Sequence, residues 1–291
     1  GRMGGVMVAH PDVAGVAFTG STEVAWGINR TLAAKNGPIV PFIAETGGQN
    51  AMIADSSALP EQIVDDVVVS AFRSAGQRCS ALRVLHIQED TADKVIEMLK
   101  GAMAQQRIGD PLSLSADIGP VIDAPSRTEL EKHRAWLDKD AKFIAAAPLD
   151  GALYKQGSFF APCAYEIGSI RELEKEIFGP VLHVVRYKAR DLERVIEDIN
   201  ASGYGLTFGL HTRITSVMRH VTGAVRAGNA YVNRSMIGAI VGVQPFGGQG
   251  LSGTGPKAGG PHYLPRFATE RVTSTDTTRQ GGNATLVSLK E

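Results

Sequence analysis

Cysteine is scarce in this chain of 291 residues, since only Cys79 and Cys163 occur and they lie far apart in the sequence. Two isolated thiols form neither a disulfide framework nor a multi-cysteine metal cluster. We therefore expect no metal site, and each cysteine is considered by itself.

Net charge and long apolar runs are also lacking. Lys and Arg together number 30, as do Asp and Glu, so the formal net charge is zero. The broad positive field that nucleic-acid binding needs is therefore not expected from this segment. No apolar run approaches the ~20 residues that cross a bilayer, and residues 10–12 interrupt the amino-terminal segment before any signal-type core. These absences favour a cytoplasmic protein with no membrane span.

Strand-like and helix-like patterns alternate along the chain, which predicts an α/β fold with a mainly parallel sheet. The predicted strands cover residues 13–18, 39–44, 50–54, 82–87, 207–210 and 229–232. The predicted helices end near Gly37, begin at Pro60, cover 92–103, begin at a capping box formed by Ser126 and Glu129, and lie near 191–200 and 214–226. The glycine-rich residues 244–260 predict a long loop, and residues 268–278 predict an edge strand.

Cys79 lies between a helical pattern and a strand pattern, beside Arg78. The thiolate is the nucleophilic form of cysteine, and an unperturbed thiol with a pKa of about 8.5 is mostly protonated at neutral pH. Arg78 could favour the charged form, although adjacent side chains often point apart. The alternative is a small buried packing residue, and Cys163 fits that description well.

Glu45 ends a predicted strand just before Gly47 and Gly48, where the chain can bend and expose the acid to a cavity. A strand-end glutamate, then a helix, then a loop cysteine could meet across the carboxyl edge of a sheet, where α/β proteins place their chemistry. A nucleophile and a base are thereby available.

Two more stretches suggest ligand binding. Residues 18–22, Phe-Thr-Gly-Ser-Thr, lead from a strand into a helix amino terminus, which attracts phosphate but can equally be a simple helix cap. Glu176 and Phe178 lie two residues apart, so an extended chain directs both to one side. They could hold a diol and a flat ring, or the stretch could be a helix end turning into a strand.

Five ordered motifs resemble the aldehyde dehydrogenase superfamily: Phe18-Thr19-Gly20-Ser21-Thr22, Glu45-x-Gly47-Gly48, Gly76-Gln77-x-Cys79, Glu176-x-Phe178-Gly179-Pro180 and Pro245-Phe246-Gly247-Gly248. Residues 44–50, 78–80 and 259–263 resemble the glutamate semialdehyde (1-pyrroline-5-carboxylate) dehydrogenase branch. Residues 281–286 resemble the dehydrogenase module of the bifunctional proline utilization A proteins.

The resemblance implies NAD-dependent oxidation of L-glutamate γ-semialdehyde to L-glutamate, the second step of proline catabolism. The Cys79 thiolate would add to the aldehyde, and hydride transfer to NAD would leave a thioester. Glu45 would activate the water that hydrolyses the thioester.

The resemblance also assigns binding residues. The cofactor-binding residues would be Thr19, Gly20, Ser21, Glu176 and Phe178, and the substrate-binding residues Arg78, Ser80, Gly248 and Gln249. The amides of the 248–249 loop would take the substrate α-carboxylate with help from the Ser80 hydroxyl. Two departures are Ala25, where many relatives have glycine, and Gln49, where many have lysine.

The same resemblance divides the chain into the end of an incomplete Rossmann-like NAD-binding domain at 1–44, a catalytic domain at 45–267, and an edge strand with a tail at 268–291. The tail could pair with a partner subunit, so a homo-oligomer is expected. Because most of the nucleotide-binding sheet would precede residue 1, the chain alone is expected to be inactive. A proline dehydrogenase domain with FAD could also lie upstream.

Three alternatives stay open from the sequence. A cysteine hydrolase or acyltransferase would need a histidine beside Cys79, and the nearest, His86, lies on a predicted strand that points away. A dehydrogenase of another aldehyde and a non-catalytic assembly module are the other two.

Overall fold

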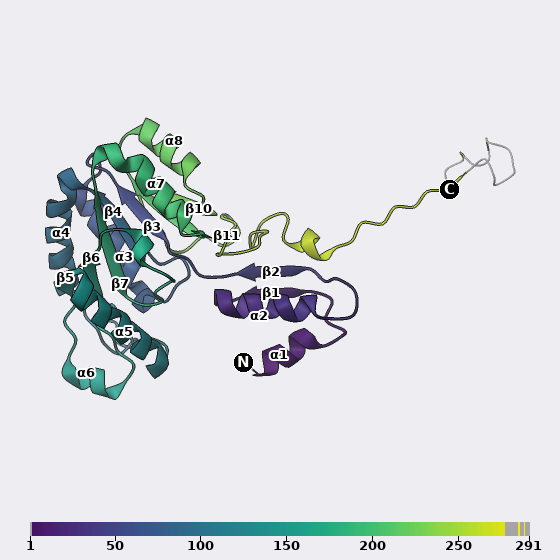
Figure 1. The fold of residues 1–291 in the computed structure, drawn as a ribbon, viewed down its shortest axis with the longest axis horizontal. Helices are drawn as coiled ribbons and strands as arrows, with labels where there is room; N and C mark the ends of the chain where they lie inside the picture. Colours follow the sequence, from purple (N-terminus) through teal and green to yellow (C-terminus); the bar gives the residue numbers. More distant parts are fainter. Residues whose placement is uncertain (1, 277–284, 286–287, 289–291) are drawn as a thin grey trace.

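A mainly parallel seven-stranded sheet forms the main body of the molecule (Figure 1). The computed structural model describes residues 2–276, 285 and 288. The strand order is β10 (Asn229–Val232), β9 (Thr207–His211), β3 (Ala51–Ala54), β4 (Val84–Gln88), β7 (Val181–Tyr187), β6 (Cys163–Glu166) and β5 (Lys142–Ala146). Only β5, which pairs with β6, is antiparallel to its neighbour in this sheet. The α/β class is confirmed.

The central strands are buried because their residues are apolar on both faces, as expected for parallel strands covered by helices. The helices around this sheet are α3 (Pro60–Phe72), α4 (Glu89–Ala104), α5 (Ala124–Asp140), α6 (Gly151–Gln156), α7 (Leu192–Ala201) and α8 (Thr215–Ala224). All residues of β3 are buried, and α3 packs its buried Ile63, Val67 and Phe72 into the same core.

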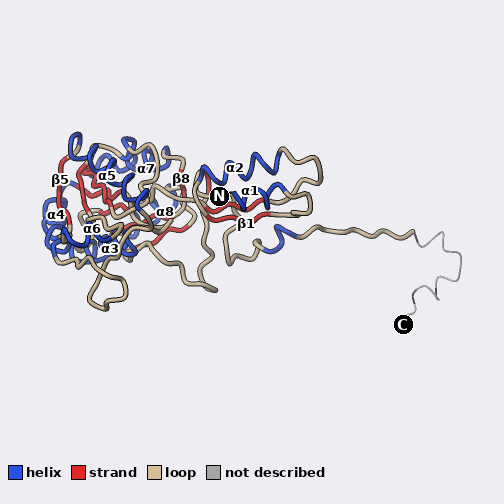
Figure 2. The backbone as a smooth tube through the Cα atoms, turned by 90° about the horizontal axis from the view of Figure 1, so that it is seen from below, coloured by secondary structure: helices blue, strands red, loops and turns tan. Residues whose placement is uncertain are grey.

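A smaller unit lies beside the main body and consists of α1 (Arg2–Ala9), β1 (Val16–Thr19), α2 (Thr22–Ala33) and β2 (Phe42–Glu45). Strands β1 and β2 form a separate two-stranded parallel sheet in which Thr19 lies opposite Glu45. Figure 2 shows this unit extending from the main body toward the carboxyl-terminal segment. Helix α1 has no buried residue.

The long loop after β10 connects the two parts. Its short strand β11 (Gln249–Gly250) pairs antiparallel with β8 (Tyr204–Gly205) of the main body. The next residues continue along β2, where the Thr254 amide donates to the Ala44 carbonyl at 2.9 Å and the Thr46 amide donates to the Ser252 carbonyl at 3.0 Å. The predicted boundary between residues 44 and 45 falls within β2, of which Glu45 is the last residue, and the chain returns to β2 after residue 250.

Two local predictions are wrong. Helix α5 begins after Asp123, whose carboxylate accepts the Ser126 amide at 2.8 Å, so Ser126 lies inside the first turn and is not the cap. Residues 268–276 form no strand within this chain and extend away from the body (Figure 1), and residues 277–278 of the same prediction lie outside the described residues.

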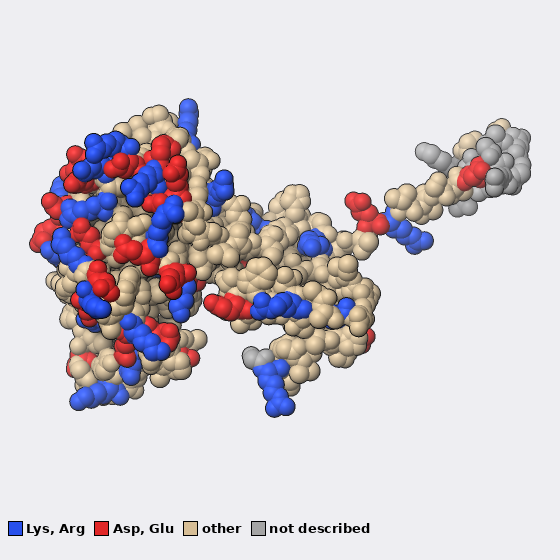
Figure 3. Space-filling model, viewed as in Figure 1, with Lys and Arg blue, Asp and Glu red and all other residues tan. Residues whose placement is uncertain are grey.

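The visible face of the main body carries Lys and Arg interspersed with Asp and Glu (Figure 3). Over the part of the chain that the structure describes, no helix is long and apolar enough to cross a membrane.

Candidate active site

Cys79 follows a short left-handed turn that ends α3. Ser74, Ala75 and Gly76 have φ angles of 56°, 52° and 63°. This conformation costs a non-glycine residue roughly 1–2 kcal/mol. At Gly76 a side chain is also excluded by space, because a Cβ there would clash with the Gly179 carbonyl group. The turn directs the chain into the loop of residues 77–83, called the thiol loop below.

Asn50 holds the thiol loop at the beginning of the central strands. Its Nδ2 donates to the carbonyls of Cys79 at 2.6 Å and Ala81 at 2.9 Å, and its Oδ1 accepts the Thr207 amide at 3.1 Å. Asn50 precedes β3 and Thr207 begins β9. The thiol loop therefore lies at the amino edge of the main sheet, which corrects the expectation of its carboxyl edge.

Glu45 reaches this region from the other sheet, where it is the last residue of β2. Its side chain is buried, Oε2 accepts the Gly248 amide at 3.0 Å, and Oε1 has no partner among the described residues. Burial raises the pKa of Glu45 to about 7, although the Gly248 amide and the charge of Lys257 oppose the rise. A carboxyl group with this pKa can accept a proton near neutral pH.

The thiol of Cys79 is half-buried, and burial raises its pKa, as do the negative charges of Glu176 and Glu45. The amides of Ser80 and of Cys79 itself act in the opposite direction. Arg78 is exposed and turns toward the turn rather than the sulfur, since its Nε donates to Ser74 Oγ at 3.1 Å. The resting group is therefore a thiol.

Arg83 was not singled out from the sequence, yet it joins the thiol loop to the Glu176 segment. Its guanidinium is buried, and Nη2 lies 3.1 Å from Glu176 Oε1. Its Cζ lies 5.5 Å from the centre of the Phe178 ring, which is half-exposed. Burial raises the pKa of Glu176, against the effect of Arg83. The sequence feature that could have indicated Arg83 is a charged residue at the start of an apolar strand pattern.

The predicted phosphate-binding residues lie at the carboxyl end of β1, beside the backbone of Glu45. The Gly20 amide donates to the Glu45 carbonyl at 3.1 Å, and Ser21 caps α2 by accepting the Val24 amide at 3.3 Å. The capping interpretation of Ser21 is thus realised, and the helix terminus remains beside the predicted base.

The residues that depart from the family pattern are both buried. Ala25 faces inward on α2, and Gln49 donates its Nε2 to the Leu173 carbonyl at 2.7 Å. Gln49 therefore serves to join the segment after β2 to the main body.

The predicted substrate-binding residues differ in their exposure in the structure. Ser80 is buried next to the sulfur, whereas Gln249 is exposed on β11. The Gly248 amide, expected to hold the substrate carboxylate, donates to Glu45 instead. A role of the Gly248 amide in holding the substrate carboxylate therefore stays a prediction, and it would require this bond to Glu45 to open.

His86 does not provide the histidine that a cysteine hydrolase would need. It is buried on β4, and both ring nitrogens lack a partner among the described residues. It lines a separate cavity of about 260 Å³ with Glu89, Asp198 and others, and Cys79 is not in that lining. Across the described residues there is also no group of three or more His, Cys, Asp or Glu placed to hold a metal ion.

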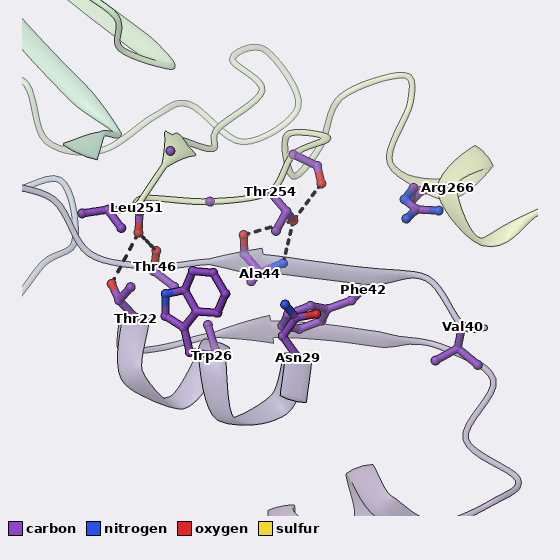
Figure 4. A pocket seen from close by; sticks show the side chains of 14 residues that line it. Thr22, Trp26, Asn29, Val40, Phe42, Ala44, Thr46, Leu251, Thr254 and Arg266 are labelled. Atoms are coloured by element: carbon purple, nitrogen blue, oxygen red, sulfur yellow. Dashed lines mark hydrogen bonds between the residues drawn. The ribbon is translucent and has the colours of Figure 1, made fainter. Parts of the chain in front are cut away.

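A cavity of about 420 Å³ lies beside the strand that ends at Glu45 (Figure 4). Trp26 and Asn29 of α2 line one side, and Thr254 and Arg266 line the other. Thr46 closes one end by donating its hydroxyl to the Leu251 carbonyl at 2.5 Å. None of the predicted catalytic residues lines this cavity.

Comparisons with known proteins show the family to which the chain belongs. Residues 1–273 match the aldehyde dehydrogenase family. The bifunctional protein PutA of Klebsiella aerogenes is 53% identical over 276 residues, which cover 92% of this chain and 21% of that protein. The chain thus spans about a fifth of the length of that relative.

Solved structures have the same fold. A crystal structure of a mutant of Bradyrhizobium japonicum proline utilization A is 58% identical with a TM-score of 0.90, covering 93% of this chain and 27% of that one. A 1-pyrroline-5-carboxylate dehydrogenase from Thermus with bound NAD is 33% identical with a TM-score of 0.83, covering 91% of this chain and 51% of that one. From the matched residues and the shared fold, this chain belongs to the aldehyde dehydrogenase family.

Proposed function

We propose that this chain carries the catalytic residues of an NAD-dependent dehydrogenase that oxidises L-glutamate γ-semialdehyde to L-glutamate. The relatives named PutA and 1-pyrroline-5-carboxylate dehydrogenase support the substrate. The observation that carries the proposal is the meeting of two elements: a loop cysteine from the main sheet and a buried strand-end glutamate from the smaller sheet, with its pKa near 7.

In this proposal the Cys79 sulfur forms a bond to the aldehyde carbon, and the thiol proton leaves to a base or to solvent. Loss of hydride from that carbon converts the adduct into a thioester. Glu45 then takes a proton from water, the hydroxide attacks the thioester carbon, and the sulfur leaves as glutamate forms. The unpartnered Oε1 of Glu45 is the atom available for that proton.

NAD, when bound, supplies the hydride acceptor. The residues fit its polar and flat groups: Ser21 lies at the amino end of α2, where phosphate binds well, and Phe178 presents a half-exposed ring. Glu176 would bind ribose hydroxyls, with its carboxylate already oriented by Arg83. Pairing of the tail with a partner subunit and inactivity of the chain alone stay predictions.

The test compares two cysteine variants in the full-length protein. We expect Cys79→Ala to abolish NADH formation from glutamate semialdehyde. Cys163→Ala should retain nearly full activity, because Cys163 is fully buried on β6 and burial raises its pKa to about 12. Equal losses in the two variants would contradict the assignment of the nucleophile.

A thiol-labelling experiment distinguishes a dehydrogenase from a non-catalytic module. Iodoacetamide labelling of Cys79 should be slowed when the aldehyde is present. Labelling at an unchanged rate, together with no NADH, would favour the non-catalytic alternative.

A further inference from the structure

We propose that Arg83 is a positioning residue, whose buried guanidinium clamps the left-handed turn and the Glu176 segment together and thereby fixes the Cys79 sulfur. The inference rests on the proposed function only for the role of Cys79 as nucleophile. The contacts that carry it concern the backbone around that cysteine.

The guanidinium makes hydrogen bonds to the backbone just before Cys79 and to a distant segment. Nη1 donates to the Gly76 carbonyl at 2.7 Å and to the Gly179 carbonyl at 3.1 Å. Nη2 donates to the Arg78 carbonyl at 3.1 Å and to Glu176 Oε1 at 3.1 Å. Two of these acceptors lie within three residues of the sulfur in sequence, and the other two belong to the segment predicted to hold the cofactor.

A buried guanidinium at residue 83 is not needed to fill space in the core. Arg83 is 1% exposed, and a buried charge is costly unless it is paired and hydrogen-bonded. An apolar side chain would fill the same space without that cost. The planar fork of donors explains the choice of arginine, because a lysine ammonium cannot reach acceptors on two sides in the same fixed geometry.

What Arg83 clamps is a strained part of the backbone. Ser74 and Ala75 adopt left-handed conformations that their side chains disfavour, and Gly76 follows in the same region. The bond to the Gly76 carbonyl holds the end of this turn against the Gly179 segment, at the place where no Cβ would fit. Without the clamp the turn can relax, and the sulfur three residues later moves with it.

Arg83 also connects the proposed nucleophile with the segment proposed to hold the cofactor. The turn and the Arg78 carbonyl orient the sulfur, while Gly179 and Glu176 belong to the segment with the Phe178 ring. One side chain therefore sets the distance between the thiol and the residues proposed to hold the cofactor. Small displacements of this kind have large effects on rate, because reacting atoms must meet in a narrow range of geometries.

The test uses Arg83→Lys and Arg83→Gln in the full-length protein. In either variant we expect amide hydrogen exchange to increase in peptides covering 74–81 and 176–180. Exchange in the strands of the main sheet should not change. We also expect kcat to fall by about ten- to a hundred-fold while KM for the aldehyde changes little. The exchange readout needs no activity, so it is independent of whether Cys79 is the nucleophile.

A matched control is Arg127→Lys. Arg127 also donates to two carbonyls, those of Tyr154 and Gly157, and its Nε lies 3.3 Å from Glu131 Oε1, but these partners lie in α5, in α6 and directly after α6. This variant should leave kcat and the exchange of 74–81 unchanged.

A rescue experiment tests the strain directly. Adding Ala75→Gly to Arg83→Lys removes the side chain that disfavours the left-handed conformation, and we expect it to recover part of the lost kcat. Unchanged exchange in 74–81, equal loosening of all strands, or global unfolding of both Arg83 variants would overturn the proposal, because each would show that Arg83 does not act locally. Activity of Cys79→Ala would instead contradict the proposed function.

Discussion

Glu45 and Cys79 both hold their protons more tightly in the folded chain than in water, and burial is the first cause for each. The negative charge of Glu45 also raises the pKa of the thiol. At neutral pH these effects favour the protonated thiol, whereas Glu45 is near the midpoint of its titration.

The first residue-scale prediction concerns the order of steps. Hydride transfer precedes the water step in the proposed mechanism, so Glu45→Gln should keep a first burst of NADH while steady turnover falls by about 10² to 10⁴. Rapid-mixing absorbance measurements separate the two phases. Loss of the burst together with turnover would mean that Glu45 deprotonates the thiol instead.

For the same variant, Glu45→Gln, we also predict a pH-dependent change in the free energy of unfolding. The folded pKa of Glu45, about 7, is above the ordinary value of 4.5, so the folded state binds the proton more tightly and loses stability as pH rises from 4.5 to 7. Glu45→Gln removes this loss, worth up to about 3 kcal/mol. Urea unfolding should show Glu45→Gln gaining stability over the wild type at pH 8 but not at pH 4. An equal difference at both pH values would contradict the raised pKa.

The elements show which features a sequence pattern can predict. Strands β3, β4, β9 and β10 and helices α3, α4, α7 and α8 were predicted close to their observed bounds, because each has a clear apolar periodicity. Of the strand predicted at 268–278, the described residues 268–276 form no strand in this chain, since their Thr and Val pattern has no strand beside it here. Strand propensity without a neighbour is weak evidence.

The sequence indicated Cys79, Glu45 and Glu176 as site residues, whose roles stay predictions, but it did not indicate the residues that hold their segments in place. Cys79, Glu45 and Glu176 come from short motifs that the family shares. The bonds from Asn50 to the Cys79 carbonyl and from Arg83 to the Gly179 carbonyl join segments far apart in sequence, so local patterns do not predict these contacts. The edge of the sheet was also predicted incorrectly, because two separate sheets, not one, carry the predicted base Glu45 and the predicted nucleophile Cys79.

Helix α5 provides an element-scale prediction. Asp123 caps the helix, and hydrogen bonds from the Ser126 hydroxyl and then from the Ser126 amide lower the pKa of its carboxyl. Asp123→Ala should loosen the first turn and speed hydrogen exchange in peptides that begin at residue 124. Ser126→Ala is the matched control, since the Ser126 amide remains, and it should change exchange less. The opposite ranking would support the Ser126 cap that the sequence suggested.

At the scale of the whole molecule, the carboxyl end of β2 in the smaller sheet faces the amino ends of strands in the main sheet. Strand β2 delivers Glu45 from its carboxyl end, and the thiol loop lies before the amino ends of β3 and β4. The loop after β10 is bonded to both units, through β8 and through Ala44. The position of Glu45 relative to Cys79 therefore depends on this loop as well as on either sheet, and the Gly248 bond is part of that connection.

Buried histidines determine how the whole molecule responds to acid. Burial lowers the pKa of His86 to about 4, although Asp198 opposes this. Burial also lowers the pKa of His183 to about 3, with His133 acting in the same direction and the hydrogen bond to the Arg83 backbone opposing it. His183 is paired with His133, their Nε2 atoms 2.8 Å apart, whereas His86 has no partner among the described residues. Both are neutral in the folded state at pH 7.

The folded pKa of His86 lies below its ordinary value of 6.5, so the unfolded chain binds the proton more tightly and stability is lost as pH falls from 6.5 toward 4. At pH 4.5 this loss is up to about 3 kcal/mol, from about 1.4 kcal/mol for each unit of pKa. His86→Phe cannot be protonated, so its free energy of unfolding should fall less than that of the wild type over this range. Urea unfolding at pH 7 and pH 4.5 measures the difference, and the exposed His262→Ala should behave like the wild type. Parallel losses in His86→Phe and the wild type would show that His86 titrates as it does in water.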